Sequence, residues 1–265
     1  MLKNDLIPLF KVSMHPDIRK EVGNVLMSGY IGEGPKVKEF EKALSDYLGC
    51  DNLVALNSAT SALHLAVSLI KRKPKSETWP GVQDGDEVLT SALTCTATNW
   101  PALANGLNLK WVDSDPSTCN LDLEDLESKL SEKTKIIIVV HWGGYPVDLD
   151  RLKSIHQKSL ELYGFAPLII EDCAHGFGSK YKGLNLGNHG NYACYSFQAI
   201  KHLTSVDGGA LILPDKDEYQ RAKLLRWYGI DRESNRKDFR CEEDIPEWGF
   251  KFHMNDVNAT IGLTN

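Results

Sequence analysis

Residues 195–209 read YSFQAIKHLTSVDGG, and the rest of the chain is organised around this stretch. The apolar and aromatic run at 192–197 predicts a buried strand, and the apolar run at 210–213 predicts a second one. The loop between them holds Lys201 among apolar residues. A desolvated lysine becomes a nucleophilic amine that can attack a carbonyl. A solvated loop lysine would have the same local sequence, so a function for Lys201 needs support from elsewhere in the chain.

That support comes from Asp172, which lies upstream in the segment PLIIEDCAHGFGS at 167–179. Residues 167–171 predict a strand, and Asp172 stands at its end. A carboxylate in this place is the partner that the pyridinium nitrogen of a cofactor requires. His175 follows three residues later, although a hydrogen-bonded core histidine would give the same pattern.

Strands alternate with helices along most of the chain. The predicted strands are 53–56, 87–91, 109–112, 135–141, 167–171, 192–197 and 210–213, and the predicted helices are 15–28, 35–48, 62–70, 97–105, 121–130, 149–163 and 217–227. This alternation indicates an α/β fold with a mostly parallel sheet. The loops at the strand ends of such a sheet converge on a ligand crevice.

The loop at 57–61 reads NSATS and joins a predicted strand to a predicted helix. Backbone N–H groups at a helix N-terminus form an anion site, which the helix dipole favours. Ser and Thr are also common as ordinary helix caps, so the loop by itself does not distinguish a phosphate site from a simple cap.

Composition limits the class of protein. The chain has 265 residues, of which 42% are hydrophobic, enough for one large domain and part of a second. A net charge of −6 gives no electrostatic footprint for nucleic acid or for an anionic membrane, and no apolar run has the length of a membrane span. The six cysteines form no CxxC pair, and Cys173 with His175 is too few ligands for a metal site. We therefore expect a soluble, cytoplasmic protein with reduced thiols and no metal.

Three motifs together resemble the DegT/DnrJ/EryC1/StrS family. They are EDCAH at 171–175, SFxxxKxLTxxxGG at 196–209 and SGYIGEGPKVKEFE at 28–41. The family consists of aminotransferases of the aspartate aminotransferase-like fold type I that use pyridoxal 5′-phosphate (PLP) and aminate nucleotide-linked keto-sugars. The resemblance runs from about residue 5 to the end of the chain. It implies the three-layer α/β/α large domain of a PLP-dependent transferase.

The resemblance also assigns roles to the residues at the strand ends. Lys201 would bind PLP covalently and shuttle a proton as general base and acid. Asp172 would keep the pyridine nitrogen protonated, and His175 would contact the cofactor's ring face or its phenolic oxygen. Glutamate is the expected amino donor. A dehydratase branch of the same fold carries histidine at the lysine position, so Lys201 favours an aminotransferase.

The phosphate of PLP would lie between Ser196 and the loop residues Ser58, Ala59 and Thr60. Three positions depart from the family pattern. Ala59 replaces a usual glycine, and Cys95 stands where an aromatic ring commonly stacks on the cofactor. Lys251, in GFKFHM at 249–254, stands where an asparagine reaches the neighbouring subunit's phosphate. A lysine can bind phosphate as a point charge, so the resemblance still implies a homodimer with shared sites.

The expected division is an N-terminal arm and helix at 1–30, a PLP-binding domain at 31–250, and the start of a C-terminal region at 251–265. The last predicted helix has no stop signal, which suggests a truncated small domain. Two alternatives to a sugar aminotransferase remain open. One is a non-catalytic or dehydratase-like relative, or a fragment that binds PLP without turnover. The other is a nucleotide-binding α/β protein without PLP.

Overall fold

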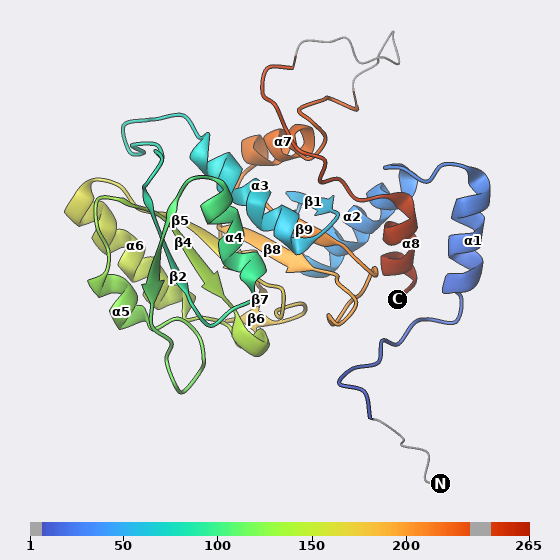
Figure 1. Ribbon diagram of the computed structural model, residues 1–265, viewed down its shortest axis with the longest axis horizontal. Coiled ribbons are helices and arrows are strands. Elements are labelled where there is room, and N and C mark those ends of the chain that lie inside the picture. The colour runs from blue at the N-terminus through green and yellow to red at the C-terminus, as the bar shows by residue number, and fades with distance from the viewer. Residues whose placement is uncertain (1–6, 234–244) are drawn as a thin grey trace.

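The computed structural model describes residues 7–233 and 245–265, and its centre is a seven-stranded sheet (Figure 1). The strand order is β1-β9-β8-β5-β4-β2-β3. Strand β9 runs antiparallel to both of its neighbours, β1 and β8, and the pairs from β8 to β3 are parallel. The strands are β1 (Leu53–Leu56), β2 (Glu87–Ser91), β3 (Asn108–Val112), β4 (Thr134–Val140), β5 (Leu168–Asp172), β8 (Tyr192–Ser196) and β9 (Gly209–Ile212).

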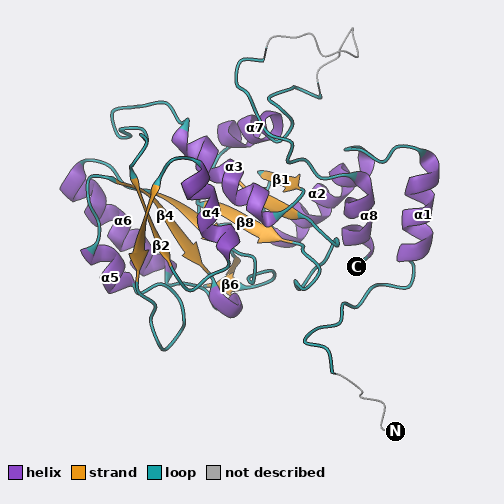
Figure 2. Ribbon diagram, viewed as in Figure 1, coloured by secondary structure: helices purple, strands orange, loops and turns teal. Residues whose placement is uncertain are grey.

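Helices cover both faces of the sheet (Figure 2). One face packs against α2 (Pro35–Leu48), α5 (Leu123–Ser128) and α6 (Leu149–Tyr163), and the other packs against α3 (Ala59–Lys71), α4 (Thr96–Ala104) and α7 (Lys216–Leu225). The predicted three-layer α/β/α fold is therefore confirmed. Strand β4 is buried along its whole length because helices cover it on both sides, as its run of apolar residues predicted.

Two further helices lie beyond the β1 edge of the sheet. Helix α8 (Asp256–Thr264) packs between α1 (Ile18–Ser28) and α2. The chain between the described N-terminal residue 7 and α1 has no regular structure and leads up to α1 (Figure 1). Its residues 10–16 line a hollow together with residues 199–204. The proposed domain limits at 1–30, 31–250 and 251–265 stay predictions, and residues 1–6 and 234–244 lie outside the described residues.

Helix α2 illustrates how local sequence sets these elements. Pro35 occupies its first turn, where a missing N–H costs nothing, and Gly49 ends it in the left-handed conformation. The buried positions Val37, Phe40 and Leu44 recur at helical spacing and face the sheet. The expected helix at 121–130 is shorter than predicted, as α5 at Leu123–Ser128. It begins after Asp122, which caps it by accepting the backbone N–H groups of Glu124 and Asp125.

Small elements complete the fold. A 3-10 turn, η1 (Trp142–Gly144), follows β4, and the hairpin of β6 (Lys180–Tyr181) and β7 (Leu184–Asn185) follows β5. Within the described residues, no helix combines the length and the apolar character that crossing a membrane requires.

Candidate functional site

The carboxylate of Asp172 lies at the end of β5 with only 4% of the residue exposed. Its Oδ2 accepts a hydrogen bond from Thr98 Oγ1 at 2.7 Å, and its Oδ1 accepts one from the backbone N–H of Ala174 at 3.0 Å. Thr98 comes from α4, on one face of the sheet, and Ala174 comes from the loop after β5. Each donor binds a different oxygen of the carboxylate, and together they restrict its rotation.

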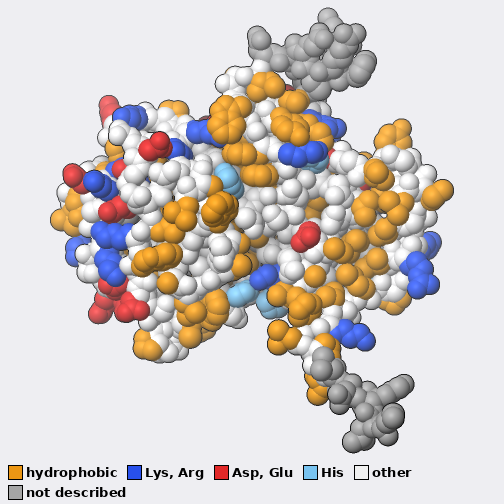
Figure 3. Space-filling model, viewed as in Figure 1, with side chains coloured by type: hydrophobic (Ala, Val, Ile, Leu, Met, Phe, Trp, Pro, Cys, Tyr) orange, Lys and Arg blue, Asp and Glu red, His pale blue; other side chains and the backbone are white. Residues whose placement is uncertain are grey.

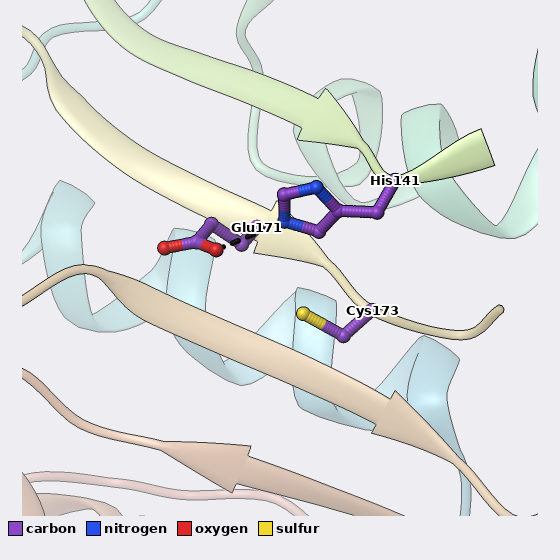
Figure 4. A group of neighbouring side chains, drawn as sticks. All are labelled: His141, Glu171 and Cys173. Atoms are coloured by element: carbon purple, nitrogen blue, oxygen red, sulfur yellow. Dashed lines mark hydrogen bonds and ion pairs between the residues drawn. The ribbon is translucent and has the colours of Figure 1, made fainter. Parts of the chain in front are cut away.

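Glu171 precedes Asp172 and points to the opposite face of the sheet, because side chains alternate along a strand. There it lies with His141 and Cys173 in a buried group whose potential ligand atoms lie within 4.8 Å of one another (Figure 4). His141 Nε2 lies 2.9 Å from Glu171 Oε2, and Asn191 donates to the other carboxylate oxygen.

Both ring nitrogens of His141 already have partners. Nδ1 accepts the backbone N–H of Val147 at 3.1 Å, so Nε2 carries the ring proton and donates it to Glu171. Burial, together with the charges of Glu171 and Asp172, raises the pKa of the Cys173 thiol, which keeps it protonated. The group is thus a satisfied hydrogen-bond network of the core, and it differs from the pairing of Cys173 with His175 considered from sequence.

Lys201 lies half-buried in the loop between β8 and β9. The loop is closed by backbone hydrogen bonds from Phe197 N–H to Gly208 and from Ser205 N–H to Phe197, both 2.9 Å long. A hollow of about 540 Å³ opens beside it, lined by Lys201, His202 and residues 10–16 of the N-terminal arm. In Figure 3, Lys or Arg side chains (blue) and His side chains (pale blue) lie next to one another near the middle of the face that is drawn.

His175 lies in the loop after β5, within electrostatic range of Lys201 and Asp172. Its Nδ1 accepts the backbone N–H of Gly143 at 3.3 Å, and its ring meets the indole of Trp142 edge-on at 5.4 Å between centroids. Burial lowers its pKa, and the positive charge of Lys201 lowers it further, while Asp172 acts in the opposite direction. His175 is therefore held neutral, and because Nδ1 is an acceptor its proton is assigned to Nε2.

Gly209 brings Ser196 next to the loop at 57–61, which is called the anion loop below. In the sheet it pairs with Ser196 on one side and with Leu56 on the other. A Cβ at Gly209 would lie 2.4 Å from the carbonyl carbon of Ser58 and 2.5 Å from the nitrogen of Ala59. Only glycine allows this approach, which packs the start of α3 directly against the sheet.

The hydroxyl of Ser58 is used as the cap of α3. It accepts the backbone N–H of Ser61 at 3.0 Å, and Ser61 Oγ donates to Asn57 at 2.6 Å. Ser58 Oγ in turn donates to Ser61 Oγ at 3.0 Å, so both hydroxyl protons have acceptors within the loop. The assignment of Ser58 to the phosphate stays a prediction. The backbone amides of Ala59 and Thr60 belong to the first turn of α3, where helices have no internal acceptors, so they can still bind an anion.

Cys95 and Lys251, two of the three positions expected to depart from the family pattern, lie at the same end of the sheet. Cys95 is exposed at the N-cap of α4, one turn before Thr98. Lys251 is exposed as well, and its backbone carbonyl accepts Asn57 Nδ2 at 3.3 Å, next to the anion loop. Its ammonium lies 4.5 Å from the ring centre of Trp227 and 3.2 Å from His253 Nε2.

Sequence reasoning missed Thr98 because a buried helical threonine has no local mark of function. It is fully buried on the face of α4 that meets β5. The helical spacing from Thr94 was visible, and the two hydroxyls lie 2.7 Å apart. The partner of Thr98, however, lies 74 residues further along the chain.

Comparison with known proteins shows the family and the fold. The model of the DegT/DnrJ/EryC1/StrS aminotransferase family matches residues 12–265. The chain belongs to this family. Its fold also matches AtS13 from Actinomadura melliaura, with 50% identity and a TM-score of 0.90, over 98% of this chain and 66% of AtS13.

Two other solved structures also match this chain in fold and sequence. The sugar aminotransferase CalS13 from Micromonospora echinospora is 47% identical, with a TM-score of 0.89, over 98% of this chain and 67% of CalS13. Spr1654 from Streptococcus pneumoniae, solved in a PLP-form, is 32% identical with a TM-score of 0.85, over 97% of this chain and 65% of Spr1654. The chain thus spans about two thirds of the length of these family members.

The groups at the strand ends fit the chemical needs of PLP. Asp172 offers a buried acceptor for a protonated ring nitrogen, and Lys201 offers an amine for an aldehyde. The amides of Ala59 and Thr60, packed against Gly209, offer a helix N-terminus for a phosphate.

Proposed function

We propose that the protein is a PLP-dependent aminotransferase that transfers an amino group from glutamate to a nucleotide-linked keto-sugar. The observation that carries the proposal is that Asp172 ends β5 and Lys201 follows the neighbouring parallel strand β8, with His175 within electrostatic range of both, in a chain of the aminotransferase family. The description of CalS13 as a sugar aminotransferase supports the substrate class, and the PLP-form of Spr1654 supports the cofactor.

Each residue has a role that follows from its chemistry. PLP, when bound, supplies an electron sink for the substrate carbon that loses or gains a proton. Lys201 would hold the cofactor and carry that proton as general base and acid. Asp172 would keep the proton on the ring nitrogen. His175, neutral with a proton on Nε2, would donate a hydrogen bond to the cofactor.

A mass-labelling experiment tests the proposal. Protein incubated with PLP and reduced with borohydride should carry the pyridoxyl mass on the peptide that contains Lys201, and Lys201→Ala should carry none. Incorporation at another lysine, or none, would refute the assignment and favour a nucleotide-binding protein. Glutamate-dependent conversion of the bound cofactor to its amine form then separates an aminotransferase from a relative that only binds PLP.

We further propose a homodimer in which Lys251 contributes to the site of the neighbouring subunit. Lys251 is exposed, and its ammonium contacts the ring of Trp227 and the Nε2 atom of His253. Light scattering should give a dimer mass, and Lys251→Ala should weaken PLP binding while Lys216→Ala, an exposed lysine on α7, should not. A monomer whose PLP affinity is insensitive to Lys251→Ala would overturn the shared site.

A further inference from the structure

We propose that Thr94 and Thr98 form a hydroxyl relay that positions the Asp172 carboxylate for the ring nitrogen of the cofactor. The proposal rests on the proposed PLP site, and it adds two residues to that site. Thr98 Oγ1 lies 2.7 Å from Asp172 Oδ2, and Thr94 Oγ1 lies 2.7 Å from Thr98 Oγ1.

The direction of the relay follows from the number of protons. A threonine hydroxyl has one proton to donate, and an ionised carboxylate only accepts. Thr98 therefore donates its one hydroxyl proton to Asp172. In the hydrogen bond between the two threonines, Thr94 must then be the donor and Thr98 the acceptor. The order of donation is Thr94 to Thr98 to Asp172, and Thr94 is the member nearest to solvent.

The relay also fixes which carboxylate lone pairs remain. Ala174 N–H occupies one position on Oδ1, and Thr98 occupies one on Oδ2. The residue is 4% exposed, so water has little access to reorient it. A carboxylate held at both oxygens by two different elements presents its remaining lone pairs in one direction, which is what recognition of a single ring N–H requires. Thr98 is thus a positioning residue, because it acts through Asp172.

An analogue of the cofactor separates this role from a structural one. 1-Deazapyridoxal 5′-phosphate has a C–H in place of the ring nitrogen, so it cannot use the carboxylate of Asp172. We expect Thr98→Val to weaken PLP binding about tenfold and to change binding of the deaza analogue less than about twofold, since a hydrogen bond to a charged group is lost. Thr98→Ser, which keeps the hydroxyl, should restore the parent affinity for PLP.

Two more variants provide an independent test of the relay and a control. Thr94→Val removes the outer donor at a partly exposed position, and it should show the same selectivity for PLP with a smaller effect, even if the buried Thr98→Val fails to fold. Thr96→Val, at an exposed threonine of the same turn, is the matched control and should change neither affinity.

The outcomes distinguish the relay from the proposed function. Equal weakening of PLP and the deaza analogue in Thr98→Val and Thr94→Val would overturn the relay and leave the PLP site standing. Unchanged binding of both ligands in both variants would overturn it as well. A parent protein that binds PLP no better than the deaza analogue would refute the role of Asp172 itself, and the relay with it.

Discussion

The carboxylate of Asp256 accepts the backbone N–H of Gly34 at 2.8 Å, across 222 residues of sequence. The same side chain accepts the N–H of Val37 at 3.1 Å and that of Lys36 at 3.3 Å. Helix α2 has a glycine at its N-cap and therefore no capping side chain of its own, so the first residue of α8 supplies the cap. This contact fixes the glycine-rich loop before α2 against the C-terminal helix.

Removing this cap should destabilise the fold. We expect Asp256→Ala to lower the free energy of unfolding by about 2–3 kcal/mol, because buried backbone donors lose their acceptor. Urea unfolding measures the effect, and Asp256→Asn should cost less because one carbonyl oxygen remains. Asp46→Ala, which breaks an exposed pair with Lys42, is the control and should cost at most about 0.5 kcal/mol. Equal losses for Asp256→Ala and Asp46→Ala would contradict the capping role.

Gly209→Ala should damage both stability and the anion loop. Its Cβ would collide with the backbone of Ser58 and Ala59, which cannot rotate away as a side chain can. We expect a loss of about 1–3 kcal/mol in unfolding free energy, together with weaker PLP binding. Gly23→Ala is the matched control, because a Cβ there meets nothing within 4 Å and should add about 0.5–1 kcal/mol of helix stability. A Gly209→Ala protein with parental stability would show that the close approach is dispensable.

Asp172→Asn should slow the half-reaction with the amino donor far more than it lowers PLP content. The amide cannot stabilise a protonated ring nitrogen as the carboxylate does, and losing a charge-assisted hydrogen bond costs about 1.5–3 kcal/mol, or roughly ten- to a hundredfold in rate. Stopped-flow absorbance with glutamate measures the step. Asp217→Asn, at an exposed position on α7, should match the parent. An Asp172→Asn variant as fast as the parent would refute the role in holding that proton.

His253 should make the protein less stable in acid. Burial, with the charges of Lys251, Arg226 and Arg232, lowers its pKa to about 3 from an ordinary value of 6.5. As pH falls from 6.5 toward 3, His253 becomes protonated in the unfolded chain but stays neutral in the folded chain. The unfolding free energy therefore falls over this range. Above pH 6.5 the contribution of His253 to stability is constant.

The non-titrating variant His253→Phe should lose less stability than the parent when pH is lowered from about 7 to about 4. Urea midpoints at several pH values measure the difference, and NMR titration of the imidazole reports the group directly. Lys251→Met should shift the His253 titration to higher pH by removing one of the opposing charges. Parallel stability curves for parent and His253→Phe would contradict this account.

The sequence alone determined the layers and the strand ends. Helices of period 3.6 and strands buried on both faces follow from local spacing, as in α2 and β4, because a periodic apolar face can be satisfied only by burial. Asp172 and Lys201 could be singled out because each stands where an apolar strand gives way to a loop, and strand ends of a parallel sheet meet at one edge.

Only the tertiary structure decided which groups touch there. The bonds from Thr98 to Asp172 and from Gly34 to Asp256, and the packing of Gly209 on the Ser58–Ala59 peptide, join elements that are remote in sequence. Nothing in the local pattern of a buried threonine, a helix-starting aspartate or a strand glycine names its partner. Those partners are set by strand order and by the angle at which each helix crosses the sheet, which arise only when the layers pack together.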